Sequence, residues 1–93
     1  MPVGLLTLEL HIQHAQSLKD KRQVLRSLKD RLRAKFNVAV AELEHQDKWQ
    51  RSVVGIVTIS GEQQHVEESL QQILAESNLI LGPVLTTHAI EII

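Results

Sequence analysis

The connection between two strand-like runs in the middle of the chain most limits its fold. Residues 38–44 and 52–60 are rich in β-branched and other apolar residues, and only the polar segment 45–51 separates them. A crossover between parallel strands needs about a dozen or more residues. The two runs are therefore predicted to form an antiparallel hairpin, which excludes a parallel α/β layout.

A strand and a helix are predicted before this hairpin. Apolar residues recur at every second position from Leu6 to Ile12, the period of a strand with one buried face. Ser17 and Asp20 then form a capping box, in which each side chain bonds a free amide and the acid lies at the positive end of the helix dipole. Apolar residues at helical spacing carry this helix to about Asn37: Leu18, Leu25, Leu28, Leu32 and Phe36.

A second helix and a last strand follow the hairpin. Ser60 and Gln63 form another capping box, and apolar residues at helical spacing continue to about Asn78. Gly82-Pro83 breaks the helix, and residues 84–93 are predicted to form a strand. The order β-α-β-β-α-β predicts a ferredoxin-like α+β fold, in which two helices cover one face of a four-stranded antiparallel sheet.

The size and composition of the chain indicate its number of domains and its cellular compartment. Its 93 residues are predicted to form a single domain, residues 1–93, and they include no cysteine for a disulfide or a zinc–thiolate site. No apolar run is long enough to span a bilayer, and Met1-Pro2-Val3 places no basic stretch ahead of an apolar one. We therefore expect a cytoplasmic protein without a secretory signal or a membrane anchor.

The net charge of -1 conceals a strong separation of charge along the chain. Residues 19–35 carry eight Lys and Arg against two Asp, whereas the rest carries two bases and nine acids. At 100° per residue, five of these cations fall within about 80° of arc over about 21 Å and form a basic ridge: Lys19, Arg22, Arg26, Lys29 and Arg33. The ridge could track a phosphate backbone, or it could be a solvated face that balances the acids elsewhere.

The hairpin segment carries side chains that chemistry could use. They supply an imidazole, a carboxylate, an indole, an amide and a guanidinium: His45, Asp47, Trp49, Gln50 and Arg51. Structural roles compete, because an Asp near a turn commonly caps its own backbone and a Trp at a tip usually buries itself on a neighbour. Arg51 can likewise close the hairpin against Glu44 or Asp47. We expect the hairpin to be mainly architectural, with an interface role for Trp49.

Other candidate residues carry weaker signals. Lys21 falls on the apolar side of the first helix, which favours a structural role in which it snorkels past the core or pairs with a carboxylate. Glu9 and His11 share a strand face and His45 and His88 lie on other strands, but no histidine has the spacing of a zinc motif. The chain has no G-x-S-x-G elbow and no Gly-rich phosphate loop. We expect no metal site, no cofactor and no catalytic residue.

The uncovered face of the sheet is predicted to be apolar and poor in aromatic residues. If the helices cover Leu6, Leu8 and Leu10, the other face carries Leu5, Thr7, Glu9, Val38, Val40 and Glu42, with Val54 and Ile56 if the alternation of the third strand is read that way. Such a patch normally meets another protein surface, and two-fold homodimers are the commonest assembly. We expect a homodimer through the open sheet face, with Trp49 at its rim.

Three segments resemble the YlxP-like family of small bacterial proteins, a domain-of-unknown-function family: "GLLTLELHI", "AQSLKDKRQVL" and "VAELEHQDKWQR". The resemblance covers essentially the whole chain, and its most specific parts are residues 17–22, 45–47 and 49–51. It implies a ferredoxin-like fold and no established enzymatic activity. It also implies a link to ribosomes or RNA, because genes of the family often lie beside those for translation initiation factor two and ribosome-binding factor A.

These features predict a non-catalytic, homodimeric protein that binds RNA or a ribosome-associated partner through the basic ridge. The alternative is a protein-interaction or small-ligand regulatory module that works through the dimer face and the hairpin, without binding nucleic acid. A third possibility is a small metal-dependent or acid/base enzyme centred on His45, Asp47 and Arg51.

Overall fold

The order of the secondary structure is the one that the sequence predicts. In the computed structural model, which describes residues 2–93, it is β1 (Val3–His11), α1 (Leu18–Lys35), β2 (Ala39–Glu44), β3 (Arg51–Ile59), α2 (Gln63–Leu81), a short 3₁₀ helix η1 (Gly82–Val84) and β4 (Leu85–Ile92). The expectation about an N-terminal signal rests partly on Met1, which lies outside the described residues. Within residues 2–93, neither helix combines the length and the apolarity that crossing a membrane requires.

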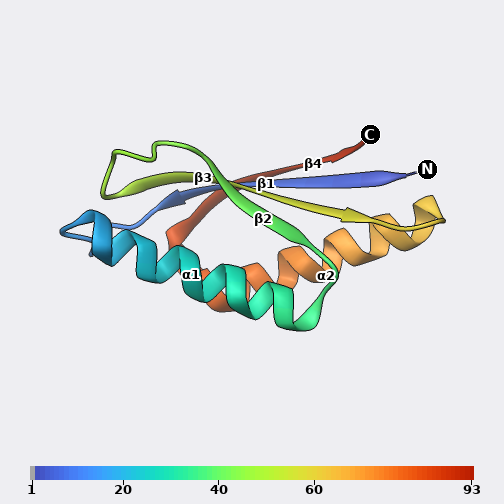
Figure 1. The fold of residues 1–93 in the computed structure, drawn as a ribbon, viewed down its shortest axis with the longest axis horizontal. Coiled ribbons are helices and arrows are strands. Elements are labelled where there is room, and N and C mark those ends of the chain that lie inside the picture. The colour runs from blue at the N-terminus through green and yellow to red at the C-terminus, as the bar shows by residue number, and fades with distance from the viewer. Residues whose placement is uncertain (1) are drawn as a thin grey trace.

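The four strands form one sheet in the order β2-β3-β1-β4, and every neighbouring pair is antiparallel. Both helices lie on the same side of this sheet, and the connection between β2 and β3 arches over the other side (Figure 1). The predicted ferredoxin-like fold is thereby confirmed.

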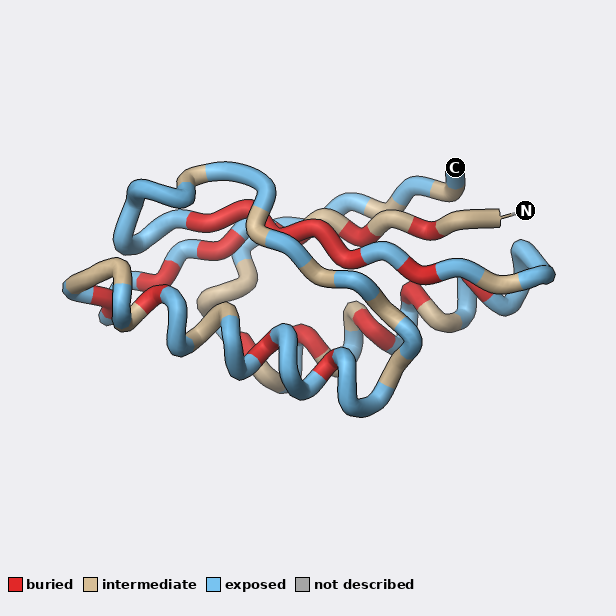
Figure 2. Tube along the Cα trace, viewed as in Figure 1, coloured by how far each residue is buried: buried red, intermediate tan, exposed pale blue. Residues whose placement is uncertain are grey.

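The core lies between the helices and alternate residues of the strands. Leu6, Leu8 and Leu10 of β1 are at most 2% exposed, and buried segments of the strands and helices face one another in Figure 2. Gly4 begins the same row. A Cβ added there would lie 2.6 Å from side-chain carbons of Val66 and Leu70, so the absence of a side chain lets α2 approach β1 closely.

The start of α1 follows the prediction closely, and the start of α2 does not. Ser17 Oγ accepts the Asp20 amide at 3.1 Å, while the Asp20 carboxylate accepts the amide of Gln16, at 2.9 Å, instead of that of Ser17. The predicted capping box at Ser60 is wrong, because α2 begins at Gln63 after Glu62. The Ser60 amide donates to the carbonyl of Pro2 at 3.5 Å, so this residue follows the end of β3 and is bonded to the residue before β1.

The second helix is also longer than predicted. It continues past Asn78 to Leu81 and ends at Gly82, whose φ of 56° lies in the left-handed region that favours glycine. The Gly82 amide donates back to the carbonyl of Asn78.

The prediction of the open face was correct for β1 and wrong for β2 and β3. Leu5, Thr7 and Glu9 lie on the open side as predicted. Val54 and Ile56 of β3, however, pair with the buried residues Leu8 and Leu6 of β1, so they face the helices. On the other side of β3, Val40 and Glu42 of β2 pair with Ile56 and Val54 and therefore face the helices too. Val38 also packs against the core. Residues 53–57 are apolar without interruption, so their alternation does not distinguish the two faces of β3.

Candidate functional site

The basic ridge lies on the solvent side of α1. All five of its residues are exposed, whereas Leu28 and Leu32 of the same helix are buried. Within residues 2–93 the ion pairs are Lys21–Glu42 and Lys35–Glu76, and neither uses a ridge residue. The five cations are therefore available to a partner, in the single row that the helical spacing predicts.

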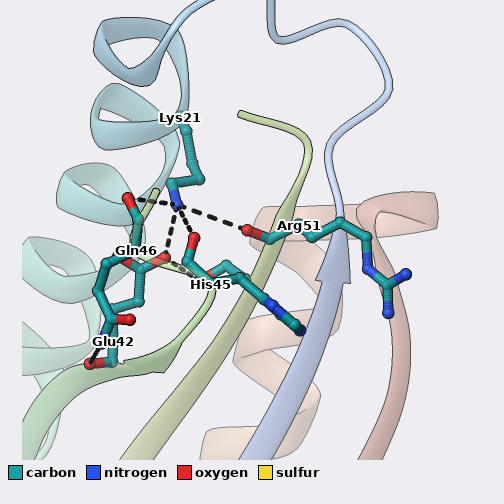
Figure 3. Close-up of polar contacts among 6 residues, drawn as sticks. Lys21, Glu42, His45, Gln46 and Arg51 are labelled. Atoms are coloured by element: carbon teal, nitrogen blue, oxygen red, sulfur yellow. Dashed lines mark hydrogen bonds and ion pairs between the residues drawn. The ribbon is translucent and has the colours of Figure 1, made fainter. Parts of the chain in front are cut away.

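A buried lysine connects α1 to the hairpin. The side chain of Lys21 is 1% exposed, and its Nζ lies 2.9 Å from Oε2 of Glu42. The same ammonium donates to the carbonyl of His45 at 2.7 Å, with longer contacts of 3.4 Å to Gln46 and 3.5 Å to Arg51 (Figure 3). Its charge is thus balanced by one carboxylate, and its protons are directed at carbonyls from both sides of the hairpin connection.

The carboxylate of Glu42 is held in place by Ser52. Ser52 is 1% exposed, and its hydroxyl donates to Oε2 of Glu42 at 2.6 Å. The expected structural role of Lys21, pairing with a carboxylate, is therefore confirmed. Its partner was not foreseen, because Glu42 was assigned to the open face of the sheet.

The residue whose carbonyl accepts the Lys21 ammonium has an unusual backbone conformation. Among residues 2–93, His45 is the residue other than glycine with a positive φ, 67°. Its carbonyl accepts both Lys21 Nζ and, at 3.0 Å, the amide of Lys48, which closes the turn. Histidine tolerates the left-handed region better than most residues. Figure 3 shows the carbonyls of His45 and Arg51 facing the ammonium, while both side chains extend away from it.

Those two side chains help to line a hollow at the hairpin end of the sheet. The hollow has a volume of about 230 Å³ and receives residues from β1, β3, β4 and the hairpin connection: Glu9, Leu10, His11, His45, Arg51, Ser52, Val53 and Thr86. We call it the hairpin hollow. His11 pairs directly with Arg51 across the β1–β3 ladder, and this register brings the strand residues together with the predicted hairpin candidates.

The remaining hairpin candidates have different environments. Gln50 is architectural, since its side-chain amide donates to the carbonyls of Gln13 at 3.0 Å and Ala15 at 3.1 Å. Asp47 is exposed. Arg51 does not form the ion pair with Glu44 or Asp47 that could close the hairpin, since in the described chain no carboxylate lies within 4.0 Å of its guanidinium.

Trp49 is 54% exposed in the single chain, so most of its surface is not covered by neighbouring residues of the same chain, and its expected interface role stays a prediction. We predict that Trp49→Ala lowers the free energy of unfolding by about 1–2 kcal/mol, because nearly half of the side chain loses contact with water on folding. Urea denaturation at low protein concentration measures the effect. A loss near 3 kcal/mol would contradict it and indicate that a second copy buries the ring.

The histidines are not gathered into a recognisable metal centre. Within residues 2–93, no group of three or more His, Cys, Asp or Glu side chains is placed to hold a metal ion. His88 pairs with Leu8 and so lies on the side of β4 toward the helices, away from Glu9 and His11. The sequence did not reveal that His11, His45 and Arg51 share one hollow, because that depends on the strand register.

The comparisons with known proteins agree on family and fold. The model of a family described as "Protein of unknown function (DUF503)" matches residues 3–78. "Uncharacterized protein YlxP" of Bacillus subtilis (strain 168) is 41% identical over 73 residues, which cover 78% of this chain and 79% of the relative.

Two solved structures have a similar fold. That of Rv0793 from Mycobacterium tuberculosis has a TM-score of 0.58 and 15% identity, with 100% of this chain and 93% of that one covered. A variant of SnoaB, a cofactor-independent oxygenase from Streptomyces nogalater, has a TM-score of 0.53 and 12% identity, with 99% and 90% covered. At such identities the likeness extends to the fold alone.

Proposed function

The chain belongs to the DUF503 family, as its resemblance to YlxP-like proteins predicts, and we propose that it is a non-catalytic cytoplasmic protein that binds structured RNA or a ribosome-associated partner through the basic ridge. The observation that carries the proposal is the row of five exposed cations on α1, none of which has a carboxylate within 4.0 Å in residues 2–93. An 18-residue helix presents them on a rigid element.

The ridge suits phosphates better than bases. Helix α1 holds its cations at fixed spacing, and cations that neutralise phosphates release counterions from the nucleic acid. The chain has one Phe, one Trp and no Tyr, so unpaired bases would find little to stack on. A duplex or a folded RNA that presents its backbone is therefore the expected ligand, with slight sequence preference.

The test of this proposal is the salt dependence of binding. Each phosphate neutralised on a duplex contributes about 0.9 to the slope of log affinity against log salt, so three or four engaged ridge residues give a slope near 3. Changing Arg22, Arg26 and Arg33 together to Gln is expected to remove most of that slope while the fold persists, because these side chains are exposed. Fluorescence anisotropy with duplex RNA and sedimentation with ribosomes measure both.

A matched control separates the ridge from overall charge. Arg31, Lys35 and Lys48 are exposed cations that lie off the ridge, and changing all three to Gln removes the same charge but should leave the slope nearly unchanged. If wild-type protein shows no salt-dependent binding at low ionic strength, or if the triple variant binds as well as wild type, the ridge is a solvated face. The interaction-module alternative would then take the place of RNA binding.

We also propose that the protein is a homodimer through the open sheet face. That face carries an apolar patch, defined by Val3, Leu5, Val57 and Ile59, at the end of the β1–β3 ladder away from the hairpin. Val57 is 37% and Ile59 is 46% exposed. A second copy of the same chain is the occupant we favour, because two-fold homodimers are the commonest assembly and a small domain gains most from the additional burial.

A further inference from the structure

We propose that the hairpin hollow binds a small carboxylate that carries a hydrogen-bond donor on the neighbouring carbon, as α-amino and α-hydroxy acids do. The inference is independent of RNA binding by α1. It rests on four side chains that reach the hollow from two strands and the hairpin connection, namely Glu9, His11, His45 and Arg51.

Arg51 and Glu9 supply opposite charges to the hollow. Across the ladder, Arg51 pairs with His11 and Glu9 pairs with Val53, so the two charged residues are diagonal neighbours on one face. Both are exposed, yet in the described chain neither has an ion-pair partner within 4.0 Å, including each other. The hollow thus offers an anion site and a cation or donor site that do not neutralise one another.

The chemistry of these groups matches a ligand with two unlike ends. A guanidinium can hold a carboxylate through two parallel hydrogen bonds. The imidazoles of His11 and His45 can donate further hydrogen bonds to the same anion. The Glu9 carboxylate only accepts when ionised, so it would repel a simple anion but receive an ammonium or a hydroxyl on the neighbouring carbon.

The size of the hollow limits the ligand. Its volume of about 230 Å³ is below the range of about 300–1,000 Å³ that is usual for sites of drug-sized ligands. A compact acid of few heavy atoms suits this volume better than a nucleotide does.

Lys21 makes the walls of the hollow rigid from the other side. Its buried ammonium holds the carbonyl of His45 at 2.7 Å and contacts that of Arg51 at 3.5 Å, while both side chains extend away from it (Figure 3). A site whose supporting groups are fixed before binding loses less entropy when the ligand enters. Lys21 is therefore a positioning residue for the hollow.

The hollow is also separate from the apolar patch. A Cβ on Gly55 would lie 2.8 Å from Cδ1 of Leu43, so the Leu43 side chain lies over Gly55 in the middle of the open face. Gly55 pairs with Thr7, midway between the hollow and the patch. A second copy centred on the patch would leave the hollow accessible from the hairpin end.

The test is a titration of the ¹⁵N-labelled full chain with glycine, glycolate and acetate, followed by backbone amide shifts. We expect saturable shifts at β1 and β3 residues of the hollow with glycine, glycolate or both. Because glycine carries an ammonium and glycolate a hydroxyl, comparing the two titrations shows which donor the hollow binds. Acetate lacks the donor and should bind at least about tenfold more weakly. No saturable shift with glycine or glycolate, or equal binding of acetate, would overturn the proposal.

Variants assign the two ends of the ligand. Arg51→Gln should weaken all binding at least about tenfold. Glu9→Ala should weaken glycine or glycolate by about that factor but strengthen acetate binding, because the carboxylate that repels a simple anion is gone. Lys48→Gln and Glu44→Gln, exposed hairpin changes that do not line the hollow, should have no effect. The variant with Arg22, Arg26 and Arg33 changed to Gln should bind the acid as wild type does, so failure of this proposal is distinguishable from failure of RNA binding. If glycine and glycolate bind Arg51→Gln and Glu9→Ala as tightly as wild type, Arg51 does not hold the carboxylate and Glu9 does not hold the donor.

Discussion

Lys21→Met is expected to destabilise the protein by about 3–5 kcal/mol, because removing one partner of a buried ion pair leaves the other charge without compensation. Here the remaining carboxylate is Glu42, whose side chain is 18% exposed and whose Oε2, the oxygen that contacts Lys21, also accepts the hydroxyl of the buried Ser52. The carbonyl of His45 loses its 2.7 Å bond as well. Urea denaturation at a fixed protein concentration measures the loss, which is large beside the total stability usual for a domain of this size.

Two further variants make this prediction specific. Lys19→Met removes an exposed charge two residues away in the same helix and should change stability by no more than about 0.5 kcal/mol. Lys21→Met combined with Glu42→Leu removes both charges and should recover part of the loss, since apolar replacements of whole buried pairs are often tolerated. Recovery stays incomplete because the His45 carbonyl still lacks its donor. Equal stability of the Lys21 and Lys19 variants would contradict the prediction.

Lys21 illustrates how far helical spacing alone can reach. The turn of 100° per residue places it on the apolar side of α1, and this is sufficient to predict a structural lysine that either snorkels past the core or pairs with a carboxylate. It does not identify Glu42, which lies 21 residues later in another element. Local periodicity gives the direction of a side chain, whereas its partner depends on how separate elements meet.

The limits of the strand predictions have the same origin. In β1, apolar and polar residues alternate clearly enough to define the two faces. In β3, the uninterrupted apolar run of residues 53–57 removes that signal, so the assignments of Val54 and Ile56 were a choice between two phases. The alternation of residues 38–42 separately assigned Glu42 to the open face, so the partner of Lys21 was placed on the wrong side of the sheet.

The hairpin hollow depends even more on register. His11 and Arg51 are 40 positions apart in the sequence, yet they face each other in the β1–β3 ladder. His45 lines the same hollow and has a left-handed backbone conformation, which the weak preference of histidine for that region is not sufficient to predict. The basic ridge is the opposite case: all its residues belong to one helix, so their spacing was sufficient to predict their arrangement.

The proposed association of two chains should be very sensitive to charged substitutions in the apolar patch. We predict that wild-type protein at micromolar concentration has twice the chain mass of 10.5 kDa, and that Val57→Asp combined with Ile59→Asp is monomeric. Both side chains lie on the apolar patch, and a carboxylate buried there against a second copy would have no partner. At a cost of about 3 kcal/mol or more per charge, the dissociation constant would rise at least about a hundredfold for each substitution.

Light scattering after size exclusion measures the mass, and circular dichroism checks that the variant is folded. Because Asp is unfavourable in strands by no more than about 1 kcal/mol and these side chains are part exposed in the single chain, the fold should survive. Leu79→Asp is the matched control: Leu79 is 80% exposed on α2, on the other side of the sheet, and its replacement should leave the dimer intact.

If Leu79→Asp dissociates the dimer and the patch variant does not, the chains associate through their helices. If the wild type is already a monomer, the apolar patch is free for a different protein partner, and the stability of the fold must then come from the single chain alone.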